Sequence, residues 1–77
     1  MQELKYIIID DFEFIIFPNY FTHAEMAQKL KGNKDITSAG FINMNNNKVN
    51  CYGESISLKL KSKKVDSRII NGYIFDN

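Results

Sequence analysis

Histidine and cysteine most readily carry acid–base or nucleophilic chemistry, and the chain has one of each, His23 and Cys51. A nucleophilic cysteine needs a base or a helix N-terminus to lower the pKa of its thiol. His23 is the only candidate base, and no spacing in the sequence brings it near Cys51. We therefore interpret Cys51 as a structural cysteine on a strand, and we expect that the protein is not an enzyme.

His23 lies in the segment Thr22-His23-Ala24-Glu25, which has two interpretations. His23 and Glu25 could act as a general base beside the positive end of a helix. The T-x-x-E spacing is also that of a capping box, in which each side chain bonds the backbone N–H of the other residue. We favour capping because it explains Glu25 without chemistry, and we keep His23 as a candidate functional residue at a helix start.

Acidic side chains cluster at Asp10, Asp11 and Glu13. Clustered carboxylates can bind a divalent cation, although an acidic turn between two strands usually only keeps that turn soluble. A single histidine and a single cysteine exclude a Cys/His zinc site within one chain. We expect no metal and no cofactor.

The densest basic stretch lies between residues 59 and 68 and contains one acidic residue, Asp66. The net charge is +1 overall, but −4 within residues 1–25 and +6 within residues 26–68. The overall balance argues against a mimic of DNA and against a strong non-specific nucleic-acid binder. The stretch could contact a phosphate backbone or an acidic protein surface, or it could be a solvated strand face whose lysines guard an edge. Its basic residues are Lys59, Lys61, Lys63, Lys64 and Arg68.

Alternation, caps and turn residues predict the elements that position these side chains. The strand at residues 55–61 would place Ile56, Leu58 and Leu60 on a buried side and lysines on an outer side. An asparagine run at 45–47 predicts a turn. The predicted strands span 5–9, 12–17, 36–44, 48–52 and 55–61, and the predicted helices span 23–31 and 64–73.

The resulting order, β-β-α-β-β-β-α, predicts an α+β fold in a single domain of residues 1–77. Both helices would pack on one face of a small, mainly antiparallel sheet. The strand at 12–17 holds four successive apolar residues and is expected at the centre of that sheet. At this chain length, burial of apolar surface barely offsets the entropy of ordering, so a homodimer that shares its core stays an open alternative.

The longest apolar runs, Tyr6–Ile9 and Phe14–Phe17, are far too short to span a bilayer. No basic region precedes the first run. We therefore expect no signal peptide, no membrane partner and a cytoplasmic location.

Three segments, Thr22–Ala27, Ser38–Phe41 and Tyr52–Ser62, resemble a class of short proteins encoded by bacteriophages and prophages. That class shares a histidine-bearing helix start, a SAGF-like strand and a GES-x-S-L-x-L-x-S strand. The resemblance spans about residues 4–70 and implies a phage context and a bacterial host, without a settled activity. The residues that it singles out are His23, Gly40, Phe41, Gly53, Glu54, Ser55 and Ser57.

The Gly53-Glu54-Ser55 bend has two interpretations of equal weight. The bend could present Glu54 and Ser55 to a ligand or partner, together with Tyr52, since tyrosine is favoured at interfaces. Alternatively, it is a corner between strands in which backbone N–H groups hold the Glu54 side chain.

Our leading hypothesis is a small phage-derived binding protein that inhibits or modulates a host protein or ribonucleoprotein complex. An anti-defence protein that blocks a CRISPR effector would be one example. The alternative is a nucleic-acid-binding protein or small transcriptional regulator that uses the basic stretch. A further alternative is a protein that binds a small anionic nucleotide signal in an oligomer cleft.

Overall fold

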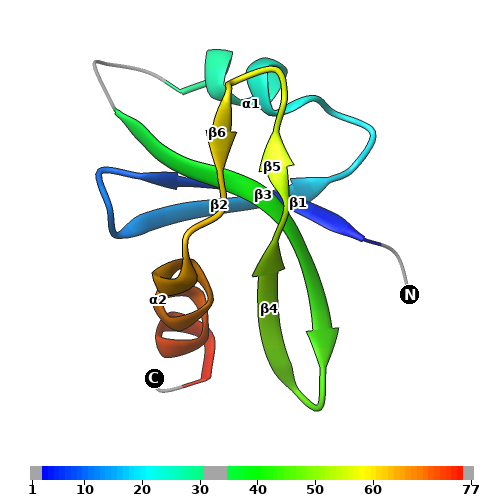
Figure 1. Ribbon diagram of the computed structural model, residues 1–77, viewed down its shortest axis with the longest axis vertical. Helices are drawn as coiled ribbons and strands as arrows, with labels where there is room; N and C mark the ends of the chain where they lie inside the picture. The colour runs from blue at the N-terminus through cyan, green and yellow to red at the C-terminus, as the bar shows by residue number, and fades with distance from the viewer. Residues whose placement is uncertain (1–2, 31–34, 76–77) are drawn as a thin grey trace.

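The computed structural model describes residues 3–30 and 35–75 and has an antiparallel four-stranded sheet at its centre (Figure 1). The strands lie in the order β2-β1-β3-β4, and β5 and β6 form a separate two-stranded ribbon. The predicted α+β class and antiparallel sheet are therefore confirmed. The strands of the main sheet are β1 (Leu4–Ile9), β2 (Glu13–Pro18), β3 (Ile36–Asn45) and β4 (Lys48–Tyr52).

Strand β1 lies inside the sheet, whereas β2, which we expected at the centre, is an edge strand. Residues Tyr6 to Ile9 of β1 are each 2% exposed or less, because both edges and both faces of this strand are covered. Strand β2 ends at Pro18, which suits an edge because proline has no N–H to donate. Both strands carry a short apolar run, so apolar content alone could not identify the central one.

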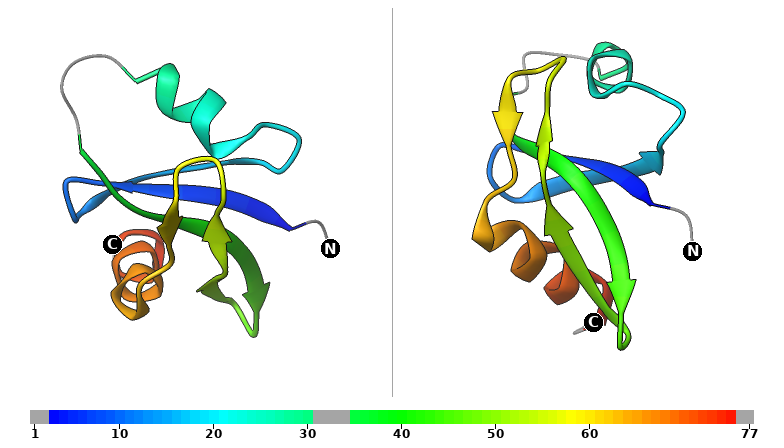
Figure 2. Two further views of the ribbon diagram at one scale, coloured as in Figure 1. Left: turned by 45° about the horizontal axis from the view of Figure 1, so that its top comes forward. Right: turned by 45° about the vertical axis from the view of Figure 1, so that its right-hand side comes forward.

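Different elements cover the two faces of the sheet, so the prediction that both helices pack on one face is wrong (Figure 2). Side chains alternate along β1, with Tyr6 and Ile8 on one face and Ile7 on the other. Helix α2 (Lys64–Phe75) covers the face of Tyr6. Helix α1 (His23–Gln28) and the β5–β6 ribbon cover the face of Ile7. A strand that is apolar on both sides needs cover on both, and each helix supplies one.

The segment predicted as a single strand over 55–61 is a tight hairpin, so that prediction is also wrong. Its two short strands are β5 (Glu54–Ser55) and β6 (Leu60–Lys61). The chain reverses at the hairpin tip, residues 56–59, where the Leu58 N–H donates to Ser55 Oγ at 3.1 Å. A side-chain acceptor at the start of a turn can break an alternating pattern that otherwise predicts a continuous strand.

Because of the turn, the three apolar residues of this segment do not all point to the core. Leu58 and Leu60 pack against the core on the face of Ile7. Ile56, expected beside them, is 86% exposed. The hairpin therefore projects an aliphatic side chain into solvent.

Two predictions made from local sequence, a capping box and a turn, are confirmed by the structure. The predicted capping box is present, because Glu25 N donates to Thr22 Oγ1 at 3.0 Å and Thr22 N donates to Glu25 Oε1 at 2.8 Å. Asn46 and Asn47 have φ angles of 53° and 62° and form the predicted turn between β3 and β4. Helix α1 ends at Gln28, before its predicted end, and residues 31–34 lie outside the described residues.

A buried carboxylate on α2 links this helix to the sheet through hydrogen bonds. Asp66 is 1% exposed, and its oxygens accept hydrogen bonds from Tyr6 Oη at 2.5 Å and Ser38 Oγ at 2.9 Å. It also accepts the Lys63 backbone N–H at 2.9 Å, just before the first turn of α2. The same side chain thus caps the helix and ties it to β1 and β3.

Neither described helix combines the length and apolar character that crossing a bilayer requires.

Candidate functional site

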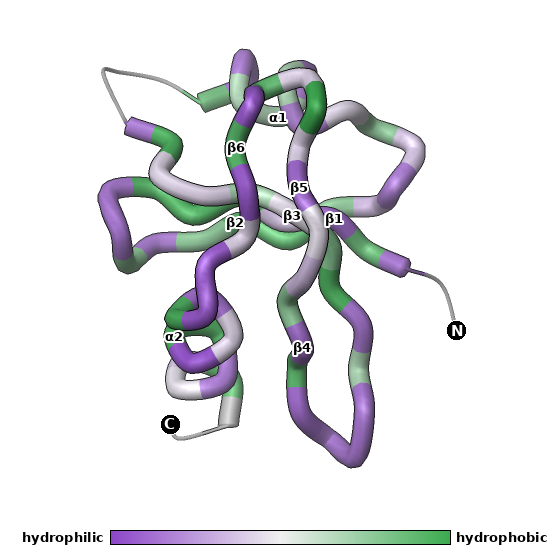
Figure 3. The backbone as a smooth tube through the Cα atoms, viewed as in Figure 1, coloured by the Kyte–Doolittle hydropathy of each residue, from purple (hydrophilic) through white to green (hydrophobic). Residues whose placement is uncertain are grey.

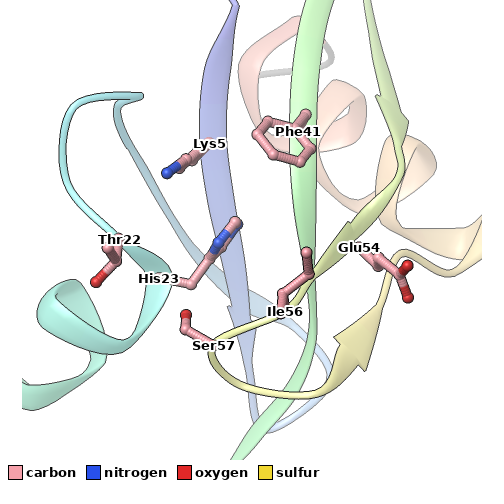
Figure 4. A pocket seen from close by; sticks show the side chains of 7 residues that line it. All are labelled: Lys5, Thr22, His23, Phe41, Glu54, Ile56 and Ser57. Carbon is pink, nitrogen blue, oxygen red and sulfur yellow. The ribbon is translucent and has the colours of Figure 1, made fainter.

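The candidate site is a pocket of about 520 Å³ between β1, the start of α1, β3 and the β5–β6 hairpin (Figure 4). All three segments that carry the phage-protein resemblance contribute to its lining, although they lie far apart in the sequence. Four of the seven residues that the resemblance singles out, His23, Phe41, Glu54 and Ser57, thus line one pocket. The lining side chains are Lys5, Thr22, His23, Phe41, Glu54, Ile56 and Ser57.

His23 stabilises the place where the start of α1 meets β3. Its side chain is 3% exposed, and its Nε2 lies 2.8 Å from the Gly40 carbonyl oxygen. Because a carbonyl only accepts, Nε2 is the protonated nitrogen in this arrangement. The rings of Phe17 and Phe41 meet the imidazole edge-on, each with centroids 5.6 Å away.

Burial lowers the pKa of His23, and nearby Lys5 adds to this, while the hydrogen bond to Gly40 opposes it. The imidazole is therefore neutral at pH 7 and links α1 to β3. This contact explains His23 through structure rather than acid–base chemistry.

Two glycines permit the close approaches that shape the pocket. A Cβ on Gly40 would lie 2.5 Å from the Tyr52 carbonyl oxygen, so no larger residue fits without a shift of backbone. Gly53 has a φ of 78°, and a Cβ there would lie 3.0 Å from the Phe41 ring. Both glycines therefore permit β3 to lie close to the end of β4 and the bend that follows it.

The remaining polar groups of the pocket are mostly engaged. Lys5 Nζ donates to the Phe21 carbonyl oxygen at 2.8 Å and lies 5.9 Å from the Phe41 ring centroid. Ser57 Oγ accepts the Ala24 N–H at 3.2 Å, which ties the hairpin tip to α1. The pocket therefore offers an apolar wall with one cation and the Glu54 carboxylate at its edge, an arrangement suited to binding.

Cys51 lies on the other face of the sheet from His23. It packs against the cluster that contains Tyr6 and Ile70, whereas His23 contacts Phe17 and Phe41. Burial raises the pKa of the Cys51 thiol, which keeps it protonated at neutral pH. The structural interpretation of this cysteine is therefore supported by its environment.

The predicted basic residues lie together and face solvent. They run from the hairpin tip, along β6, to the first two turns of α2, and Figure 3 shows hydrophilic residues along this path. Among the residues that the structure describes, one salt bridge involves this set, between Lys63 and Asp11 at 3.6 Å. We call the set the basic row; it comprises Lys59, Lys61, Lys63, Lys64 and Arg68, all exposed.

Three candidate residues lie at or just before the bend that leads into the hairpin, and two of them have a structural role. Ser55 is 1% exposed and its hydroxyl builds the turn, so the prediction that it is presented to a partner is wrong. The Tyr52 hydroxyl hydrogen-bonds the Glu3 carboxylate, and its ring packs against Phe41 with centroids 6.0 Å apart. Glu54 is exposed at the pocket edge and stays available to a partner.

The acidic turn is used within the fold. Asp10 Oδ1 accepts the Asp35 N–H at 3.2 Å, and Asp11 pairs with Lys63. In the described part of the chain, no group of three histidine, cysteine or acidic residues is arranged to hold a metal ion.

Sequence reasoning missed Ile56 and Lys5 as members of the site. Ile56 was assigned to the core because it alternates with Leu58 and Leu60, and only the turn reverses its direction. Lys5 gave no signal, because its place at the pocket depends on the partner strands of β1.

Comparison of the chain with protein-family models, with curated proteins and with solved structures finds no match in any of the three.

Proposed function

We propose that the chain is a small binding protein that attaches to a host macromolecule through the hairpin tip and the basic row, and that it acts by covering a functional surface of that partner. The observation that carries this proposal is Ile56. An isoleucine that is 86% exposed at the tip of a tight, hydrogen-bonded hairpin has no role in the core. Its burial in a partner would contribute roughly 1.5–3 kcal/mol.

The surroundings of Ile56 indicate the chemistry of the partner. Lys59 shares the hairpin tip and Lys61 follows on β6, so two exposed cations lie on the same hairpin as the apolar anchor. An apolar centre with a charged rim is the usual anatomy of a protein interface. The partner expected from this surface is a protein with a small apolar pocket and an acidic rim.

The phage origin of the chain and its bacterial host are part of the proposal and rest on the sequence resemblance alone. In that setting the partner would be a host protein or ribonucleoprotein complex, and its occlusion would inhibit or modulate it. The pocket beside the hairpin supports the same use, because Phe41 and Glu54 continue the contact surface away from the tip.

Affinity capture from bacterial host extract tests this proposal. The wild-type chain is expected to retain one partner, and Ile56→Asp is expected to reduce its recovery by roughly ten- to a hundredfold, since each 1.4 kcal/mol is a factor of ten. Met44→Asp is the matched control, because Met44 is 41% exposed on the β3–β4 hairpin, which points the opposite way (Figure 1). Recovery that Ile56→Asp leaves unchanged contradicts the proposal.

Nucleic-acid binding is the second candidate, and the exposure of the basic row favours it. It predicts binding that weakens steeply with salt, because each neutralised phosphate releases counterions. A nuclease treatment that abolishes capture, together with insensitivity to Ile56→Asp, would select this function over protein binding.

A further inference from the structure

The two edges of the main sheet differ in how their outward backbone groups are bonded. At the β4 edge, side chains of α2 supply the partners. Asn71 Oδ1 accepts the Val49 N–H at 2.8 Å, and Ser67 Oγ accepts the Cys51 N–H at 2.9 Å. Strand β2 is paired with β1 alone, and in the described part of the chain no hydrogen bond reaches its outer side before Pro18. The sheet therefore has one closed edge and one open edge.

The direction of the backbone groups along β2 follows from the β1–β2 turn. The Phe12 N–H donates to the Ile9 carbonyl oxygen at 3.2 Å, so Ile9 turns its backbone groups toward β2. Its partner in the register is Glu13, which faces β1 in return. Successive residues of a strand turn their N–H and C=O groups to opposite sides. The backbone groups of Phe14 and Ile16 therefore point outward, away from the sheet.

The side chains of this open edge are apolar. Residues 14–17 read Phe-Ile-Ile-Phe, and the first three of them are only half-buried. Edge strands are usually guarded by lysines, by inward-pointing charges or by bulges. Between Phe14 and Phe17, β2 has no charge and its pairing with β1 has no register shift. Unbonded backbone groups and half-exposed apolar side chains thus occur together, as pairing with a further strand requires.

We propose that β2 pairs with β2 of a second copy of this chain, antiparallel and about a twofold axis at Ile15, so that the two sheets become one. An axis perpendicular to the sheet keeps the faces of both copies aligned. Ile15 then lies opposite Ile15 of the second copy. Phe14 lies opposite Ile16 of the second copy, and because both are outward residues, each such pair exchanges two N–H···O bonds.

The two neighbouring registers would lose backbone bonds. An axis one residue later, at Ile16, would pair Phe14 with Pro18, which has no N–H to donate. An axis one residue earlier, at Phe14, would pair Ile16 with Phe12, whose N–H is already bonded within the turn. The axis at Ile15 pairs only residues whose outward N–H and C=O groups are both available.

The side chains also match across this axis, which favours a second copy over an unrelated strand. Apolar residues of one copy lie opposite apolar residues of the other. The one charged residue of β2, Glu13, lies opposite Phe17 of the second copy, so like charges do not face each other. A chain this short gains little from its own core, and a shared sheet extends that core. Strand β2 and the β5–β6 hairpin belong to different sheets, so this inference does not depend on the proposed function.

The mass of the full chain in solution is the first test. Sedimentation equilibrium across a micromolar concentration range should give twice the chain mass of 8.9 kDa. A chain that keeps the single mass throughout this range contradicts the proposal.

Charges placed at the axis test where the two copies meet. Ile15→Lys and Ile15→Glu each put two like charges directly opposite, so each variant alone should raise the dissociation constant of the dimer about a hundredfold. An equal mixture of the two should restore the dimer, because opposite charges then face each other. Met44→Lys is the control, since Met44 is 41% exposed on the β3–β4 hairpin, and its mass should match the wild type. Single variants that stay dimeric, or folded variants that do not associate when mixed, contradict the proposal.

Cysteine cross-linking tests the register without a change of charge. In a Cys51→Ser background, Ile15→Cys should form a disulfide-linked dimer on oxidation, because residues directly opposite lie within the Cα separation of about 4.4–6.8 Å that a disulfide needs. Ile16→Cys is the matched control and should not cross-link, because it faces position 14 of the second copy. Cross-linking at position 16 alone, equal cross-linking at both positions, or none at position 15 would overturn the proposal.

Discussion

Replacing Tyr6 with phenylalanine should destabilise the fold through one buried hydrogen bond. Tyr6 is fully buried, and its hydroxyl donates to Asp66 at 2.5 Å. The change removes one oxygen and leaves the ring, so no large cavity forms. Loss of a hydrogen bond to a buried charged group costs about 1.5–3 kcal/mol. Urea unfolding followed by circular dichroism should show this decrease with an unchanged m-value.

Ser38→Ala is the companion variant, because Ser38 donates to the other carboxylate oxygen of Asp66 at 2.9 Å. It should cost a comparable amount, and the double variant should show non-additivity, since both hydroxyls serve the same carboxylate. If Tyr6→Phe and Ser38→Ala both leave the free energy of unfolding unchanged, the carboxylate does not fasten α2 to the sheet.

The same residue gives the protein a pH dependence at alkaline values. Burial raises the pKa of Tyr6, and its hydrogen bond to Asp66 raises it further. The native state therefore keeps the proton above pH 10, where an unfolded tyrosine loses it. Stability due to Tyr6 is complete below about pH 10 and falls by about 1.4 kcal/mol for each further unit. Tyr6→Phe should lose this component, which the difference between the two pH profiles isolates.

Other contacts make further predictions. His23 has a lowered pKa in the native state, so the unfolded state binds a proton more readily and stability should fall as pH drops below about 6.5. His23→Gln should flatten that fall in urea unfolding between pH 7 and pH 5. Gly40→Ala places a Cβ 2.5 Å from the Tyr52 carbonyl oxygen and should cost about 1–3 kcal/mol, measured by thermal unfolding. Ser55→Ala removes the acceptor of the Leu58 N–H and should lower stability by about 1 kcal/mol while loosening the hairpin tip, seen as faster amide exchange at Leu58.

Local rules anticipated the parts of the fold that depend on a few neighbouring residues. The capping box at Thr22 and Glu25 and the turn at Asn46 and Asn47 form through contacts between residues at most three apart, so their spacing is visible in the sequence. Helix α2 begins at Lys64, as predicted, but the hydrogen bond from the Lys63 N–H to Asp66 was not part of that prediction.

The other features of the fold depend on contacts between distant segments, which the sequence pattern does not determine. An apolar run such as that of β1 shows that both faces need cover but not which helix covers each. The alternation of Ile56, Leu58 and Leu60 predicts a strand until Ser55 supplies the bond that turns the chain. The candidate pocket could not be predicted for the same reason, since it forms where four separate segments meet.

Site-specific photocrosslinking at position 56 tests the central claim most directly. A photoreactive amino acid in place of Ile56 reports whatever lies against the hairpin tip in host extract, and the same substitution at Met44 is the comparison. We predict a discrete protein adduct from position 56 and none from position 44. Adducts of equal yield from both positions, or an adduct from position 44 alone, would contradict the assignment of the hairpin tip as the contact surface.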